Sequence, residues 1–260
     1  MNSLSIKKLS VAFQKGTPSE KKVLDEVNLE LEKDDFVCIL GSNGTGKSTL
    51  LKAILGLVPY TGSISLNEKP IDNEKPYKRA RKIGVVYQDP LTGTSPNLTV
   101  GENLLLASRK KSFLNKKANR AFLNKAKEDL SSYGLGIEER MRTPTGLLSG
   151  GMRQVLTLYM ASTFDSELLL LDEHTAALDP NAATKVMDIT ENILVQKKHI
   201  PTLMVTHNLD FALRYGNRLI VLNKGKIVLD VKNEEKKSLT REALLESYGA
   251  ILSDKTLLRE

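Results

Sequence analysis

One glycine-rich segment restricts the fold of this chain more than any other feature. The apolar run Phe36–Leu40 leads directly into a loop with glycines, a lysine and a serine at the spacing of a phosphate-binding loop. Glycines let the backbone curl so that its N–H groups converge on an anion, and a helix beginning at Lys47 adds its positive end. Lys47 brings a charge to the β- and γ-phosphates, and the Ser48 hydroxyl can bind Mg²⁺. The predicted nucleotide-binding residues are Gly41, Ser42, Asn43, Gly44, Thr45, Gly46, Lys47, Ser48 and Thr49.

A pair of carboxylates follows another apolar strand. Asp172 and Glu173 come directly after the leucine run 168–171, and open α/β sheets bind their ligands at the carboxyl ends of strands. Asp172 is predicted to contact the metal, and Glu173 to accept a proton from, or orient, an attacking water. Such a pair can also simply begin a helix, but the upstream loop favours the catalytic interpretation.

A second glycine-rich segment, Ser149-Gly150-Gly151, also enters a helix, because apolar residues follow it at near-helical spacing. Helix N-termini attract anions, although Ser149 could act only as an N-cap. One phosphate loop already encloses the phosphates of one nucleotide. We therefore expect this segment to serve a nucleotide held by another copy of the chain.

The rest of the chain alternates strands and helices, which favours parallel βα units. Besides Phe36–Leu40, strands are predicted over residues 27–31, 83–87, 168–171, 202–206 and 219–222. Runs of Leu, Ala, Lys and Asn predict a helical insertion over residues 101–146. A hairpin over 219–230 is followed by a charged tail with a helix over 240–248.

Composition excludes several classes of protein. The chain has 260 residues, of which 40% are apolar and 27% charged, so it can bury a core. The single cysteine, Cys38, cannot form an intramolecular disulfide and suits a reducing compartment. We see no signal-peptide block and no apolar stretch of the roughly 20 residues that a bilayer requires. We therefore expect any contact with a membrane to be made through a partner.

The net charge of +7 is concentrated in residues 109–142, which carry ten Lys and Arg against four Asp and Glu. A basic stretch of this kind can contact nucleic acid, an anionic membrane surface or an acidic partner, or it can be the solvated face of a helix. Charge alone does not decide between these alternatives.

Taken together, these segments resemble the ATP-binding cassette (ABC) ATPases, the energy-coupling subunits of ABC transporters. The likeness runs from about residue 4 to residue 230, and residues 148–154 resemble the family's signature motif. By the same resemblance Gln88 matches the glutamine that contacts the metal, His207 the switch histidine at the γ-phosphate, and Phe13 the aromatic residue that stacks on adenine. Trans-acting roles at the partner's nucleotide are implied for Ser149, Gly150, Gly151, Gln154 and, in the dimer-communication loop 177–180, Asp179.

The sequence departs from the family pattern at two places. His174 stands where many members have proline, and Met152-Arg153 replaces the commoner Gln-Gln or Gln-Arg. The change at His174 can alter the loop after Glu173 but removes no catalytic group of the family. The change at Met152-Arg153 lies away from the glycines, so we expect it to be tolerated.

The resemblance implies an α/β P-loop NTPase fold with a mixed, mainly parallel core sheet, an antiparallel β subdomain and a helical insertion. The nucleotide-binding domain is expected over residues 1–235, with its core at about 1–88 and 163–235 and a helical subdomain at about 89–162. Residues 236–260 are expected to form a C-terminal helical extension.

The implied function is ATP hydrolysis coupled to transport. Two chains are expected to form a head-to-tail homodimer around two ATP and Mg²⁺, with Ser48, Gln88 and Asp172 at the metal and Glu173, His207 and Gln88 in catalysis. The dimer is expected to lie at the cytoplasmic face of the membrane and to drive a separate permease. The sequence around these motifs is similar to that of a bacterial importer subgroup that works with a solute-binding lipoprotein. This similarity suggests an amino-acid-type solute.

A soluble ABC ATPase acting on nucleic acid or ribosomes is the alternative from another class. Such relatives usually carry two cassettes or a long coiled coil, and this chain has neither, so nucleic acid is not the expected partner. A P-loop kinase or GTPase explains neither residues 149–154 nor His207.

Overall fold

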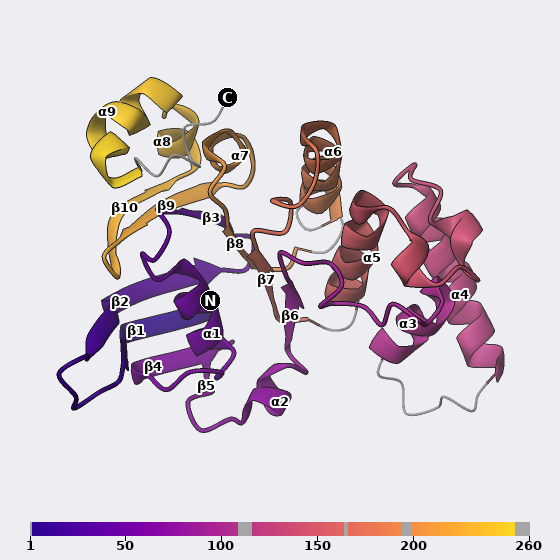
Figure 1. Ribbon diagram of the computed structural model, residues 1–260, viewed down its shortest axis with the longest axis horizontal. Helices are drawn as coiled ribbons and strands as arrows, with labels where there is room; N and C mark the ends of the chain where they lie inside the picture. Colours follow the sequence, from indigo (N-terminus) through magenta and orange to yellow (C-terminus); the bar gives the residue numbers. More distant parts are fainter. Residues whose placement is uncertain (1, 109–115, 164–165, 194–198, 253–260) are drawn as a thin grey trace. The chain divides into compact units, whose positions relative to one another are not determined.

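The computed structural model describes residues 2–108, 116–163, 166–193 and 199–252 (Figure 1). These residues form two compact units. The first unit comprises Met1–Gly84, Glu167–Glu173 and His199–Glu260, and the second comprises Val85–Ser166 and His174–Lys198. Residues 174–198, which we expected in the core, therefore group with the helical residues. Each unit is described by itself below.

The strands lie in the first unit, except for the end of β6. They are β1 (Asn2–Phe13), β2 (Lys21–Glu32), β3 (Phe36–Leu40), β4 (Thr61–Leu66), β5 (Lys69–Pro70), β6 (Ile83–Val86), β7 (Leu168–Asp172), β8 (Thr202–Val205), β9 (Arg218–Asn223) and β10 (Lys226–Lys232). The chain passes from the first unit to the second within β6.

Helices are found in both units. The first unit has α1 (Lys47–Ile54), α2 (Pro76–Arg79), α7 (Leu209–Arg214), α8 (Asn233–Lys237) and α9 (Arg241–Leu252). The second unit has α3 (Val100–Ala107), α4 (Lys116–Ser131), α5 (Gly150–Thr163), α6 (Pro180–Glu191) and the short 3-10 turns η1 (Glu138–Arg140) and η2 (Thr145–Leu147).

The larger sheet has the strand order β10-β9-β3-β8-β7-β6. β3 pairs in parallel with β8 on one side and β9 on the other, β7 pairs in parallel with β8, and the hairpin strand β10 is antiparallel to β9. All five residues of β3 are buried, as expected for a central parallel strand covered on both faces. The mixed, mainly parallel core sheet is thus confirmed.

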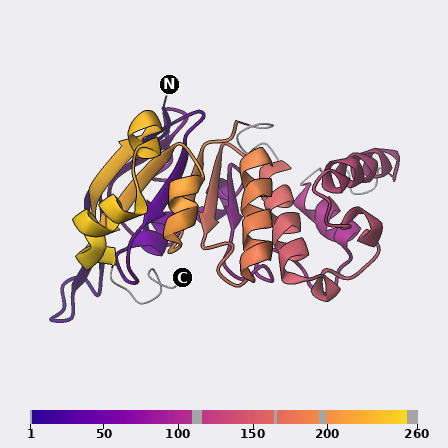
Figure 2. The same cartoon turned by 90° about the horizontal axis from the view of Figure 1, so that it is seen from above.

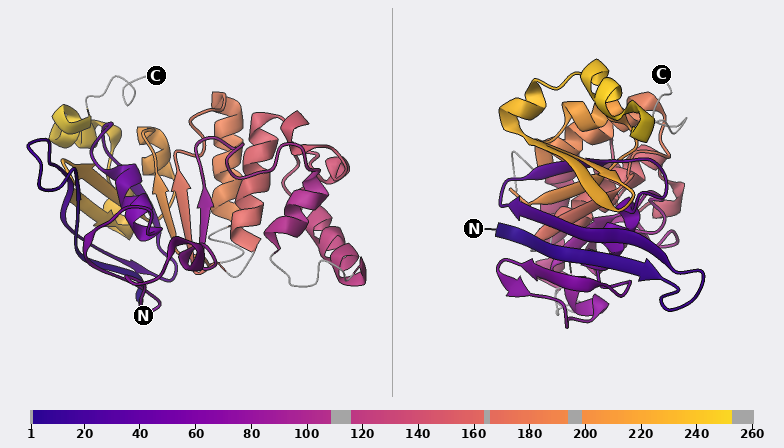
Figure 3. Two further views of the ribbon diagram at one scale, coloured as in Figure 1. Left: turned by 60° about the horizontal axis from the view of Figure 1, so that its bottom comes forward. Right: turned by 90° about the vertical axis from the view of Figure 1, so that its left-hand side faces the viewer.

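A separate antiparallel sheet, in the order β2-β1-β4-β5, forms the predicted antiparallel β subdomain (Figure 3). The predicted strand 27–31 lies within β2, where buried and exposed side chains alternate. The sequence pattern did not identify β1 or β4. The reason in β1 is a break in alternation: its register against β2 shifts four times, and Lys8 has a φ of 49°, which places successive side chains off the two-residue period.

The second unit contains the helical insertion and, beyond it, α5 and α6, which run side by side (Figures 1 and 2). Helix α3 begins with a capping box, since the Thr99 hydroxyl accepts from the Glu102 N–H and the Glu102 carboxylate accepts from the Thr99 N–H. The helical insertion predicted over 101–146 contains α3 and α4, and short 3-10 turns follow the glycines of 134–136. The first part of the basic segment 109–142, residues 109–115, lies outside the described residues.

The tail after β10 forms two helices, α8 and α9, and α9 includes most of the predicted helix 240–248. Residues 253–260 of the expected extension lie outside the described part. Among the described residues, no helix combines the length and apolarity needed to cross a bilayer.

Candidate nucleotide-binding site

The predicted phosphate loop lies between β3 and α1. Gly44 and Gly46 have φ angles of 78° and 107°, which glycine adopts without the strain that other residues suffer. A side chain at Gly41 would meet the Leu222 carbonyl oxygen at 2.5 Å, and one at Gly46 would meet the Val23 carbonyl oxygen at 2.9 Å. The loop therefore needs glycine both for its curl and for its close approach to β9 and β2.

Lys47 points back into the loop. Its ammonium donates to the carbonyl oxygens of Gly41 at 2.6 Å and Ser42 at 3.0 Å, and the residue is only 5% exposed. A buried ammonium is costly unless it is surrounded by acceptors. The sequence thus places a positive charge inside a cradle of backbone groups, as a triphosphate requires.

Arg79 holds the far end of α1. Its guanidinium donates to the last carbonyls of the helix, those of Ala53 and Ile54, and also to the Tyr60 hydroxyl. It is 2% exposed. Sequence reasoning missed this residue, because nothing in the spacing of α2 indicates that Arg79 caps a helix more than 20 residues earlier.

Ser48 and Asp172 come together as predicted for a metal site. The Ser48 hydroxyl lies 3.3 Å from Asp172 Oδ1 and donates to it. Burial raises the pKa of the Asp172 carboxyl, and the bond from Ser48 opposes this effect. A hydroxyl and a partly desolvated carboxylate are hard oxygen ligands of the kind that Mg²⁺ prefers, so the residues present fit this ion.

Glu173 pairs with His207. His207 Nδ1 lies 3.2 Å from Glu173 Oε2, and this hydrogen bond lowers the pKa of the Glu173 carboxyl below its ordinary value, while burial opposes the shift. Glu173 has a φ of 47°, a conformation that costs of order 1–3 kcal/mol in a residue other than glycine and that often occurs at active sites. The pair gives an ionised carboxylate whose direction is fixed by an imidazole.

Two other predicted residues are exposed. Phe13 ends β1 and is 41% exposed, which leaves its ring accessible for stacking. Gln88 lies two residues beyond the end of β6 and is exposed. The roles of both residues stay predictions.

In the second unit, the signature segment and the dimer-communication loop share one cavity. It has a volume of about 400 Å³ and is lined in part by Ser149, Gly150, Gly151, Leu178 and Asp179. A side chain at Gly150 would meet the Leu178 side chain at 3.1 Å, so glycine permits the two segments to approach. Both segments also cap the helix that follows: Ser149 Oγ accepts from the Met152 N–H, and Asp179 Oδ1 accepts from the Ala182 N–H.

Gln154, for which a trans-acting role is predicted, lies in the interior of the second unit. Its side chain is fully buried, and its Nε2 donates to the Tyr87 carbonyl at 3.2 Å. Its Oε1 is buried without a hydrogen-bond partner in the described part of the chain. The contact with Tyr87 ties α5 to the residue before Gln88. The trans-acting role of Gln154 stays a prediction.

Arg153 was expected only to be tolerated, yet it shapes the entrance to the signature segment. Its guanidinium donates to the carbonyl oxygens of Thr145, Gly146 and Leu148 at 2.8–3.2 Å. Five donors in a rigid fork can satisfy several carbonyls of one turn at once. Arg153 therefore holds the turn that precedes Ser149.

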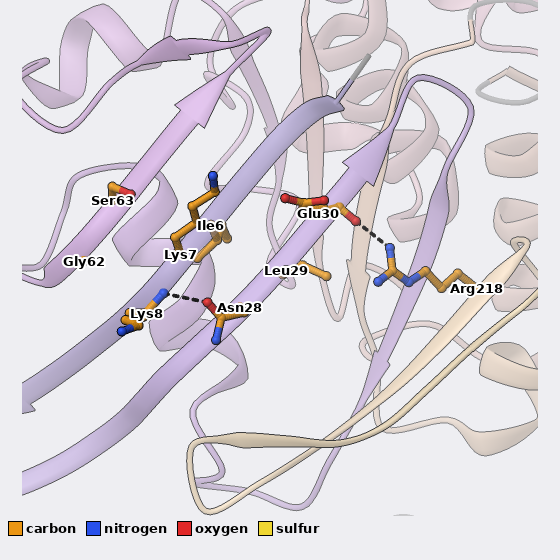
Figure 4. Close-up of a pocket in the computed structure, with 9 residues that line it drawn as sticks. All are labelled: Ile6, Lys7, Lys8, Asn28, Leu29, Glu30, Gly62, Ser63 and Arg218. Atoms are coloured by element: carbon orange, nitrogen blue, oxygen red, sulfur yellow. Dashed lines mark hydrogen bonds between the residues drawn. The ribbon is translucent and has the colours of Figure 1, made fainter.

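A cavity of about 750 Å³ lies apart from these residues, over β1, β2 and β4 of the antiparallel sheet (Figure 4). The Lys8 N–H donates to Asn28 Oδ1 there, and Arg218 donates to the Glu30 carbonyl. Arg218 is also bound to Asp230 and Asp35. Its charge is thus already paired, and no residue of the phosphate loop lines this cavity.

The fold, the phosphate loop and the carboxylates that follow β7 define a class of protein. A family model described as ABC transporter matches residues 24–176, more than half of the chain. The chain belongs to this family, and it is an ABC ATPase.

Relatives of known name extend the match to nearly the whole chain. A tyrosine transport ATP-binding protein of Clostridioides difficile is 46% identical over 247 residues, which cover 94% of this chain and 98% of the relative. A phosphonates import ATP-binding protein of Lactococcus lactis subsp. cremoris is 35% identical and covers 89% of this chain and 94% of its own length.

Solved structures agree with the fold. A dimeric bacterial ABC transporter cassette, MJ0796, is 27% identical and superposes with a TM-score of 0.74, over 88% of this chain and 98% of its own. Another dimer of the same cassette, in a post-hydrolysis state, holds ADP and Pi. The P-loop NTPase fold expected from the sequence is confirmed.

Proposed function

We propose that this chain is the ATP-hydrolysing subunit of a bacterial importer, which closes as a head-to-tail homodimer around two ATP and drives a separate membrane permease. The observation that carries the proposal is the pairing of Ser48 with Asp172 and of Glu173 with His207. Ser48 lies in α1, Asp172 ends β7 and Glu173 follows it, so two oxygen ligands for a metal and an oriented carboxylate belong to the same unit as the phosphate loop.

The residues of the first unit divide the chemistry between them. The loop amides and Lys47 bind the triphosphate and favour charge on its β- and γ-oxygens. Ser48 and Asp172, with Gln88 as a predicted third ligand, hold Mg²⁺, which when bound neutralises charge on the phosphates. Glu173 accepts the proton of the water that attacks the γ-phosphorus, as the bond to the leaving ADP breaks. His207 directs the Glu173 carboxylate toward that water.

A second copy supplies the other face of each nucleotide in this proposal. Ser149 and Asp179 are exposed and line the same cavity, and the similar cassette MJ0796 forms a dimer. Because the two surfaces of a chain differ, a twofold axis creates two equivalent sites. ATP then favours the closed dimer, and loss of phosphate favours its opening.

The relative from Clostridioides difficile suggests the solute. Its name states tyrosine transport, and it matches nearly all of this chain. We therefore propose an amino acid such as tyrosine as the imported solute, delivered to the permease at the membrane by a solute-binding lipoprotein. Copurification from detergent-solubilised membranes checks the class: a permease supports the proposal, whereas ribosomes or DNA support the alternative of a soluble ATPase.

The substitution Glu173→Gln tests the catalytic assignment. The amide cannot accept the water's proton, so we expect ATP turnover to fall about 10²–10⁴-fold, while ATP binding persists and traps a dimer. Turnover is measured by phosphate release, and dimers by analytical ultracentrifugation with MgATP.

Glu167→Gln is the matched control, because Glu167 directly precedes the same strand and its carboxylate accepts from the Asn67 side chain rather than from His207. It should leave turnover and association unchanged. Full turnover in Glu173→Gln would remove Glu173 from the role of base, and absence of an ATP-dependent dimer would remove the proposed assembly.

A further inference from the structure

The C-terminal helix α9 packs against α7, the short helix that follows His207, and α8 packs against β9 and β10 (Figure 1). These elements all belong to the first unit. The proposed function leaves this part of the chain without a role, and its contacts include two charged side chains, those of Lys236 and Arg241.

Lys236 of α8 is the centre of these contacts. It is 3% exposed, and its ammonium donates to the carbonyl oxygen of Tyr215 and, at 2.8 Å, to that of Gly216. Helix α7 ends at Arg214, and these carbonyls belong to its C-cap residue, Tyr215, and to the residue after it. A cation is favourable at the negative end of a helix, whereas a buried ammonium is costly without such acceptors. Lys236 is thus fixed to one end of α7.

A second contact lies at the other end of α7. Arg241 of α9 forms an ion pair with Asp210 in the first turn of α7 at 3.2 Å. Leu244, one turn further along α9, is fully buried. The two C-terminal helices therefore hold α7 at both ends.

Helix α7 is joined to His207 through a single residue. Asn208 caps the helix, since its Oδ1 accepts from the Phe211 N–H at 2.9 Å, and its own N–H donates to Thr206 Oγ1 at 3.0 Å. A helix of six residues with both ends fixed moves as one piece. Any displacement of its C-terminal end is thus transmitted to His207 and to the 3.2 Å distance between His207 and Glu173.

The Tyr215 carbonyl also connects this contact to the phosphate loop. It accepts from the Cys38 thiol at 3.1 Å, and Cys38 lies in β3, the strand that leads into the loop. One carbonyl oxygen is therefore shared by β3 and by the C-terminal helix α8.

We propose that Lys236 is a positioning residue for ATP hydrolysis: by holding the C-terminal end of α7, it keeps His207 in hydrogen-bond contact with Glu173. The C-terminal helices thereby set the rate of turnover without touching the nucleotide. This inference rests on the role proposed above for His207.

The test is Lys236→Met, which removes the charge and the donors but keeps an unbranched side chain. Lys237→Met is the matched control, because Lys237 lies on the same helix, is 73% exposed and pairs with Glu234 of that helix. We expect kcat to fall about tenfold or more in Lys236→Met, with the Kd for a fluorescent ATP analogue within about twofold of the wild type. The control should match the wild type in both.

A spectroscopic measurement separates positioning from a general loss of structure. The chain has three histidines, so the imidazole NMR signal of His207 can be assigned by its loss in His207→Gln. It should shift in Lys236→Met while the His174 signal stays in place. Arg241→Ala, at an exposed ion pair, provides a second variant if Lys236→Met does not fold, and should also shift the His207 signal.

The outcomes distinguish the two proposals. If Lys236→Met folds, a wild-type kcat and an unmoved His207 signal overturn the positioning role. If it does not fold, an unmoved His207 signal in Arg241→Ala overturns that role. Full turnover in His207→Gln would instead refute the proposed role of His207 in hydrolysis.

Discussion

His174 makes a sharp prediction about acid stability. It is 2% exposed, and its Nε2 lies 3.2 Å from Thr190 Oγ1. The Thr190 hydroxyl donates its own proton to the Val186 carbonyl, so it can only accept from His174. Burial lowers the pKa of the His174 imidazole from its ordinary value of 6.5 to about 4, because the charged form loses its hydration.

The sign and size of the effect follow from proton binding. At pH 7 the imidazole is neutral in both the folded and the unfolded chain. Between pH 6.5 and 4 only the unfolded chain takes up the proton, so the free energy of unfolding decreases as the pH falls through this window. One pKa unit corresponds to about 1.4 kcal/mol, so lowering the pH from 7 to 5 should remove about 2 kcal/mol through His174 alone.

The assay is urea unfolding followed by circular dichroism at pH 7 and pH 5, in EDTA and without nucleotide. His174→Gln keeps an N–H donor for Thr190 but does not titrate, so it should lose about 2 kcal/mol less than the wild type between the two pH values. His199→Gln is the control: this histidine is exposed and pairs with Asp34, and its variant should follow the wild type. Equal losses in the wild type and His174→Gln would refute the reasoning.

Two more predictions concern the phosphate-loop helix and the metal. Arg79→Met should lower the free energy of unfolding by about 3–5 kcal/mol, because it leaves the Ala53 and Ile54 carbonyls buried without their donor. Chemical denaturation measures this loss. Arg81 is exposed, and a loss no larger than that of Arg81→Met would contradict the prediction. Withdrawal of Mg²⁺ with EDTA should reduce phosphate release by about a hundredfold or more, reversibly, whereas turnover that persists without a divalent ion would show that Ser48 and Asp172 serve another purpose.

The sequence predicted those parts of the site that depend on local spacing. The phosphate loop could be recognised because its glycines, Lys47 and Ser48 are close together in the chain, and Asp172 because an apolar strand precedes it. The positions of Ser48 and Asp172 relative to each other required only that both follow parallel strands of one sheet.

Features that depend on distant packing could not be predicted. The burial of Gln154 is one of them, because the helical turn after Ser149 directs it inward to Tyr87. Arg79 and Lys236 cap helices far from them in sequence, and no periodic pattern encodes such contacts. In β1 the irregular register obscured the two-residue alternation on which strand assignment depends.

The order of strands around β3 has a consequence for how the protein is made. Both neighbours of β3, β8 and β9, come from the last third of the chain, and Gly225 donates its N–H to the Thr45 carbonyl of the phosphate loop. The ribosome therefore synthesises the five apolar residues of β3 long before β8 and β9 are available to pair with them. Unpaired apolar strands favour aggregation of the nascent chain. A truncated chain that ends before β8 leaves β3 unpaired and prone to aggregate, and ATP cannot stabilise it.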